Sequence, residues 1–167
     1  MIKPLFQKII VAVNGSEQSI HAAMYGIMMA KIYKCQLKAV YVVDTVALKQ
    51  LEFSKIFLAE ESERYEKNLI ADGNKYLSYV AELAKQKGIK IETELRKGAI
   101  WSEVITAADE FKADVILLGG KEHNSQSIGQ AIRHDKVSAT NSEIIGSAKC
   151  NVFVVRQKEI EKLFKIA

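Results

Sequence analysis

Apolar residues gather in four short, nearly unbroken runs along the chain, at positions 9–13, 37–43, 115–118 and 152–155. Runs of this length are typical of strands that helices cover on both faces, as in a parallel sheet. A fifth segment, 89–95, alternates apolar with polar residues. That alternation predicts a strand with one face in water, at an edge of the sheet.

Between these runs the apolar positions follow a helical spacing. Steps of three and four residues at 17–33, 61–87 and 100–111 place apolar side chains on one stripe of each predicted helix. Ser16 is placed to cap the first of these helices, and Gly88 to end the second. Strands that alternate with helices predict an α/β fold with a doubly wound, parallel sheet of five strands.

The length of 167 residues suits one domain with a full core. We predict that this domain spans residues 1–156 and that a tail spans residues 157–167. The tail has the spacing of one or two amphipathic turns, for which packing on the protein's own dimer is the favoured role. Residues 45–60 are too apolar for a free linker, which favours a short helix or a lid over the strand ends.

The charge and the cysteine content make several classes of function less favoured. The formal net charge is +4, and the lysines are spread along the chain instead of forming the basic stripe that nucleic-acid binding favours. No leader-like segment and no membrane-length apolar run appears, which favours a cytoplasmic location without a membrane partner. Cys35 and Cys150 are too few for a disulfide framework and are predicted to be buried thiols.

The stretch after the fourth strand is the main candidate for chemistry. The strand runs into Gly119 and Gly120, then into a polar loop over 121–136 and a short helix. A strand that leads through glycines to a helix start is how α/β proteins build anion and nucleotide sites. The loop carries several cations, namely Lys121, His123, Arg133, His134 and Lys136. Two interpretations stay open: an anion clamp made of side chains, and a solvated insertion.

Catalytic and metal-binding patterns are absent from the sequence. We find no base–nucleophile pair, no paired carboxylates at a strand end and no P-loop lysine. Of the histidines, only His123 and His134 are placed to meet, and no nearby cysteine completes a ligand set with them. His21 is predicted to stand alone. The sequence therefore predicts neither an enzyme nor a metal site.

Three segments resemble the universal stress protein family. They are IIVAVNGSEQS at 9–19, ADVILLG at 113–119 and AKCNVFVVR at 148–156. In order and spacing they are similar to that family's opening strand and "S-E-x-S" helix start, its "A-D-L-I-V-M-G" strand and its closing "A-P-C-P-V-L-V-V". The resemblance implies a Rossmann-like sandwich akin to the adenine nucleotide alpha hydrolases, with the strand order 3-2-1-4-5.

The resemblance also implies a homodimer, in which the last strands pair across a two-fold axis. The residues expected at that seam are Val152, Phe153, Val154 and Val155.

Nucleotide-binding members of that family carry Gly, two residues, Gly, nine residues and then Gly-Ser or Gly-Thr. Gly119 matches the first glycine, whereas Glu122 stands at the second. Ser138 and Ala139 fall on the final pair, so a glycine and a hydroxyl are missing, and the loop is longer than the family spacing. These departures resemble the branch of the family whose members are not thought to bind ATP.

Three further positions match the nucleotide pocket of the family. Asn14 stands where an aspartate commonly lies near the adenine, while Val42 and Leu118 match positions that line the adenine pocket. Asn offers a donor and an acceptor where Asp offers acceptors only. The binding residues implied by the resemblance are therefore Asn14, Val42, Leu118, Gly119, Ser138 and Ala139.

Two functions follow. The first is a cytoplasmic, non-catalytic regulatory dimer with a degenerate nucleotide site, which meets a protein partner and needs no cofactor. The second is a stress sensor that binds ATP or AMP with a rebuilt loop over 119–138.

Overall fold

The computed structural model describes residues 2–120 and 138–167. Its centre is a parallel sheet in the order β3-β2-β1-β4-β5. The strands are β1 (Lys8–Val13), β2 (Gln36–Asp44), β3 (Ile91–Gly98), β4 (Val115–Gly119) and β5 (Asn151–Val155). The predicted α/β class and the predicted strand order 3-2-1-4-5 are confirmed.

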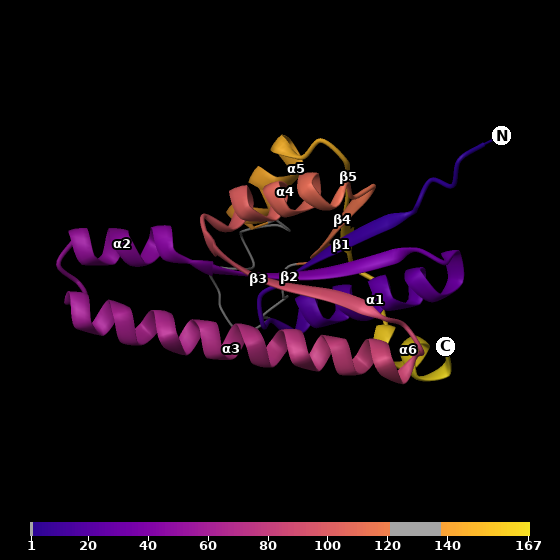
Figure 1. Cartoon of the computed structure of the whole chain (residues 1–167), viewed down its shortest axis with the longest axis horizontal. Helices are drawn as coiled ribbons and strands as arrows, with labels where there is room; N and C mark the ends of the chain where they lie inside the picture. The colour runs from indigo at the N-terminus through magenta and orange to yellow at the C-terminus, as the bar shows by residue number, and fades with distance from the viewer. Residues whose placement is uncertain (1, 121–137) are drawn as a thin grey trace, which may run out of the picture.

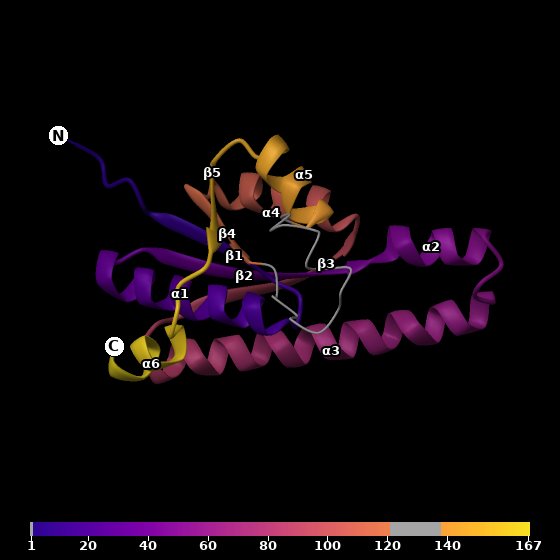
Figure 2. The same ribbon diagram turned by 180° about the vertical axis from the view of Figure 1, so that it is seen from behind.

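Helices cover both faces of the sheet, as Figures 1 and 2 show. One face packs against α1 (Glu17–Tyr33), α3 (Ala59–Gln86) and α6 (Ile160–Ile166), and the other against α4 (Ile100–Phe111) and α5 (Ala139–Ser147). Ile9 and Val11 of β1 point into the first core and Ile10 into the second, and all three side chains are fully buried. Burial on both faces explains why this strand reads as a continuous apolar run.

The uncertain segment 45–60 contains α2 (Thr45–Phe53), so the predicted short helix is present. Asp44 ends β2 and caps this helix, because its Oδ1 accepts from the Ala47 N–H at 2.9 Å. In Figure 1, α2 and the first half of α3 project beyond the sheet as a helical hairpin. The alternative of a lid over the strand ends is therefore wrong for this helix, which packs on α3.

The C-terminal tail also forms a helix, α6, whose buried side chains join the same core as α1 and α3. Ile160 and Phe164 are 2% and 5% exposed. The helix lies against α1 of its own chain. No described helix combines the length and the hydropathy needed to cross a membrane.

The two cysteines were predicted to be buried thiols, and the structure shows both half-buried. The Cys35 thiol donates to the Phe6 carbonyl oxygen at 3.1 Å. Burial raises the pKa of both thiols above the ordinary value, and nearby carboxylates add to the effect. Cys35 and Cys150 are therefore less nucleophilic than free thiols.

The edge strand β3 shows where the alternating pattern misleads. Glu94 was expected on the solvent-exposed face of this strand, yet its side chain is half-buried. Arg96 explains this, because it donates to Glu94 at 2.6 Å, to Glu103 at 2.7 Å and to Glu110 at 2.9 Å. Lys38 of β2 forms a second ion pair with Glu94. Ion pairs from Arg96 to Glu103 and Glu110 therefore link β3 to α4.

This ion-pair network predicts acid-sensitive stability. Burial raises the pKa of Glu94, but Lys38 and Arg96 oppose it strongly enough that the net pKa lies below the ordinary 4.5. Because the folded pKa is lowered, the stabilisation is present above the unfolded pKa and is lost as the pH falls through the folded pKa. Urea unfolding of Glu94→Gln should give about 1 kcal/mol less stability than wild type at pH 7, with the difference shrinking in acid. A difference that grows in acid would contradict this.

Candidate functional site

A cavity of about 390 Å³ opens at the carboxyl ends of β1 and β4. β1 and β4 are neighbours at the centre of the sheet. After β1 the chain adds β2 on one side of this pair, and after β4 it adds β5 on the other side. Such a switch point is where open α/β sheets bind their ligands. The fold therefore puts the candidate site where the sequence pattern expected it.

The first wall of the cavity is the turn between β1 and α1. Gly15 takes φ +83°, and the Ser16 N–H donates to Asn14 Oδ1 at 2.9 Å. Ser16 caps α1, as predicted, because its Oγ accepts from the Ser19 N–H at 3.1 Å. Since the Asn14 oxygen is engaged in the turn, the amide NH₂ is the part of this side chain that remains to face a ligand.

The second wall is the end of β4, where Gly119 lies against the first turn of α1. A Cβ at Gly119 would stand 2.7 Å from the backbone C of Gln18 and the backbone N of Ser19. Neither atom belongs to a side chain that can swing away. The glycine is therefore required for packing between β4 and α1, in addition to any role in approaching a ligand.

The third wall is the start of α5. Ser138 caps this helix, since its Oγ accepts from the Asn141 N–H at 3.1 Å. The Asn141 side-chain amide in turn donates to the Gly119 carbonyl oxygen at 3.0 Å. This bond ties α5 to the end of β4. The serine in place of the family's glycine thus has a clear local role as a helix cap.

The cavity has an aliphatic side and a neutral polar side. The aliphatic residues are Ala12, Val13, Val40, Val42, Ile100, Val104, Leu118 and Ile144. The polar residues are Asn14, Ser16, Gln18, Ser19, Ser138, Thr140 and Asn141. None of the described residues that line it carries a formal charge. This surface suits a flat, neutral ring with hydrogen-bonding groups on its edge.

Five of the six predicted binding residues line this cavity: Asn14, Val42, Leu118, Gly119 and Ser138. Ala139 is the exception, because it begins α5 between two lining residues without lining the cavity itself. The basic loop residues proposed as an anion clamp lie outside the described residues, and so does Glu122.

Several lining residues were missed by the sequence analysis. Val40 precedes Val42 by two positions and Ala12 precedes Asn14 by two, so strand periodicity alone contained the signal for both. Thr140 and Asn141 carried a weaker signal, as polar residues in the first turn of a predicted helix. Val104 comes from α4 on the covering face, and only the tertiary fold brings it to the cavity.

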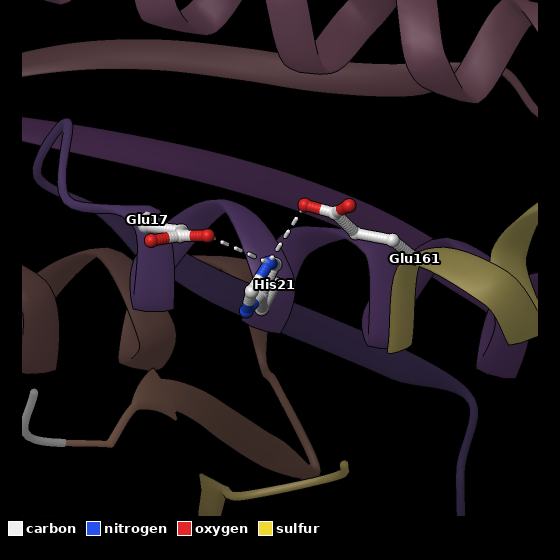
Figure 3. A group of neighbouring side chains, drawn as sticks. All are labelled: Glu17, His21 and Glu161. Carbon is white, nitrogen blue, oxygen red and sulfur yellow. Dashed lines mark hydrogen bonds and ion pairs between the residues drawn. The ribbon is translucent and has the colours of Figure 1, made fainter. Parts of the chain in front are cut away.

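A separate cluster joins α6 to α1. His21 Nε2 lies 3.2 Å from Glu161 Oε1 and 3.8 Å from Glu17 Oε1 (Figure 3). His21 was predicted to stand alone, and this is wrong because α6 returns across α1. The three groups offer ligand atoms within 4.8 Å of one another. Both carboxylates are more than half exposed, so we interpret the cluster as a surface contact that anchors α6.

The comparisons with known proteins agree with this architecture. A sequence model described as "Universal stress protein family" matches residues 5–156. A universal stress protein of Methanocaldococcus jannaschii is 30% identical over 160 residues, which cover 94% of this chain and 86% of that protein.

Solved structures of the same family share the fold. A universal stress protein from Burkholderia pseudomallei superposes with a TM-score of 0.69 at 18% identity, covering 93% of this chain and 100% of its own. The universal stress protein from Archaeoglobus fulgidus in complex with dAMP superposes with a TM-score of 0.59 at 15% identity, covering 92% of this chain and 100% of its own. At these identities the likeness concerns the fold alone.

Proposed function

Because this chain belongs to the universal stress protein family, we propose that it is a non-catalytic binding protein that holds an adenine nucleoside monophosphate in the cavity between β1 and β4. The observation that carries the proposal is the cavity's chemistry at the switch point of the sheet. Its volume is about 390 Å³, with an aliphatic side facing neutral amides and hydroxyls. A purine needs these two surfaces, one for its faces and the other for its edge.

Different lining residues would contact different parts of the nucleotide. Val42, Leu118 and Val104 would contact the faces of the base, and the amide groups of Asn14 and Asn141 would meet its polar edge or the ribose. Asn14 presents an NH₂ group to the ligand, because its oxygen is held in the turn. A donor at this place suits a ring nitrogen that accepts, and it does not suit an exocyclic amine that donates.

Two observations support the monophosphate over ATP. The described lining residues provide no cation to neutralise a triphosphate. A relative with the same fold is known in complex with dAMP, which is an adenylate with one phosphate. The ATP-binding alternative depends on residues 121–137, which the structure does not describe.

The first test is a calorimetric titration with adenosine, AMP and ATP, each with and without Mg²⁺. We expect AMP to bind at least about tenfold more tightly than ATP, a difference of about 1.4 kcal/mol. Tighter binding of ATP would favour a rebuilt phosphate clamp. Absence of heat with all three ligands up to about 1 mM, which corresponds to about −4 kcal/mol, would contradict nucleotide binding and favour a module that meets a protein partner.

Filling the cavity should remove the binding. Ala12 lies beside Val40 in the sheet and lines the cavity, so Ala12→Leu places three extra carbon atoms where the base would lie. We expect AMP affinity to fall at least about a hundredfold, or 2.8 kcal/mol. Ala59→Leu makes the same change at an exposed position of α3 and should bind like wild type. Equal AMP affinity in both variants would show that AMP binds outside this cavity.

The proposal also includes a homodimer that forms through β5. This strand is an edge of the described sheet, since β4 is its one partner there. An edge strand offers unpaired N–H and C=O groups to another strand. The seam therefore comprises Val152, Phe153, Val154 and Val155, as the family resemblance implied.

A further inference from the structure

We propose that an apolar groove beside the β5 edge binds the N-terminal arm, residues 2–5, of a second copy of this chain. The inference rests on the proposed dimer and adds a second contact to it. The groove has a volume of about 230 Å³ and lies between the second half of α1, β5 and α6. Its main lining residues are Tyr25, Met28, Ile32, Phe153, Ile160 and Leu163.

The groove is apolar and partly open. Seven of the ten lining residues have no hydrogen-bonding side-chain group, and the other three are Tyr25, Tyr33 and Gln157. Ile32 at its rim is 64% exposed. Apolar side chains that remain in contact with water at a concave surface favour an apolar ligand. Burying one large aliphatic side chain there is worth about 1.5–3 kcal/mol.

The N-terminal arm offers such a ligand. Ile2 and Leu5 are 95% and 80% exposed. The arm runs away from the body of the protein beyond the start of β1 (Figures 1 and 2). Its inner end is fixed, because the Phe6 ring packs against the rings of Tyr33 and Phe153, each at 5.9 Å between centroids. Two large aliphatic side chains therefore stand in water next to a fixed anchor.

The conformation of the arm lowers the cost of docking. Pro4 is the only proline of the chain. Its ring fixes φ near −65°, and it forces the preceding Lys3 toward an extended conformation. An arm that is already extended loses less entropy when it binds than a flexible one. Four extended residues span about 13 Å.

A second copy is the occupant that the geometry favours. Tyr25, Phe153 and Gln157 line this groove and also the hollow along the outer edge of β5. A partner that pairs with β5 is therefore next to the groove as well. Phe6 of the same chain already lines this groove. Beyond Phe6 the arm runs away from α1 and α6 in both views, so its own Ile2 would have to turn back to reach the groove.

Cross-linking between two copies tests the inference. In a Cys35→Ser/Cys150→Ser background, one preparation carries Leu5→Cys and another carries Ile32→Cys. Serine at position 35 keeps a donor for the Phe6 carbonyl oxygen. After mixing, a short bismaleimide should produce a covalent dimer of the two chains. The matched control replaces Ile32→Cys by Phe53→Cys, which is 91% exposed on the projecting hairpin, and should give at least about tenfold less product.

Each outcome decides the question. A product with Ile32→Cys and little with Phe53→Cys supports the exchanged arm. Equal yields, or no product with either, overturn it. A chain that carries both Leu5→Cys and Ile32→Cys and links only within itself also overturns it, because the arm would then dock on its own groove.

Sedimentation separates this inference from the dimer on which it rests. Leu5→Asp should raise the dimer Kd about tenfold, whereas Phe53→Asp, which adds the same charge at a 91% exposed position of the projecting hairpin, should leave it unchanged. If wild type sediments as a dimer and the cross-link fails, the arm contact is wrong, whereas the proposed dimer is unaffected. If wild type is a monomer at every concentration tested, the seam itself is wrong.

Discussion

Gly119→Ala is expected to lower the free energy of unfolding by about 3 kcal/mol, at the upper end of what overpacking a close contact usually costs. The added Cβ would lie 2.7 Å from two backbone atoms of α1, the C of Gln18 and the N of Ser19. Relief requires that the first turn of α1 moves away from β4. Because a domain of this size is stable by only about 5–15 kcal/mol in total, such a loss is large.

The control for this substitution is Gly146→Ala in α5. A Cβ there meets nothing within 4 Å. Alanine also costs less than glycine in a helix, so this variant should gain about 0.5 kcal/mol. Urea unfolding of both variants at neutral pH measures the difference directly. A Gly119→Ala variant within about 0.5 kcal/mol of wild type would show that β4 and α1 do not approach as closely as described.

This result bears on how glycines near a ligand site are understood. A glycine after the fourth strand suggests close approach of the backbone to a phosphate, and the family resemblance implied that Gly119 is a binding residue. The structure places the close contact between Gly119 and α1. Loss of ligand binding in a Gly119 variant would therefore not separate a sensor from a partner-binding module. Ala12→Leu is the sharper test, because it changes the cavity and leaves the β4–α1 contact unchanged.

The strands, the helices and the α/β class were predictable because burial determines their apolar pattern, whereas the strand order came from the family resemblance. β1 and β4 are covered on both faces, and their side chains are apolar at almost every position. Val42 and Leu118 were named from the family resemblance, and both line the cavity near the carboxyl ends of β2 and β4. Side chains on strands keep a period of two, so such positions can be counted from the sequence.

What could not be predicted depends on contacts between distant segments. The partner of His21 is Glu161, 140 residues later in the chain. Glu94 is half-buried because Arg96 and Lys38 pair with it, although its place in an alternating strand indicated a wet face. Asn141 matters through a bond to the carbonyl oxygen of Gly119. In each case a charged or polar group is held by a partner whose position only the folded chain reveals.

The second large effect is expected at the proposed dimer seam, where Val154→Pro should raise the dimer Kd at least about a hundredfold. The Val155 carbonyl oxygen accepts from the Gly120 N–H at 3.3 Å, so it faces the β4 side. Backbone groups of consecutive strand residues point to opposite sides, and the N–H of Val154 therefore points outward. Proline removes this donor without removing a hydrogen bond to β4. Because the dimer is two-fold symmetric, two such hydrogen bonds between the copies are lost, and each loss costs about 1–3 kcal/mol.

The monomer should tolerate the same change. Proline occurs on edge strands where the missing N–H faces outward, and the residue before it is restricted to the extended region that Phe153 already occupies in β5. Sedimentation velocity over a range of concentrations measures the dimer, and circular dichroism checks that the fold persists. Val154→Ala keeps the N–H and should dimerise within about threefold of wild type. If Val154→Pro remains folded and its dimer Kd stays within about threefold of wild type, the two copies meet on another surface, because pairing through this edge would lose one outward donor from each copy.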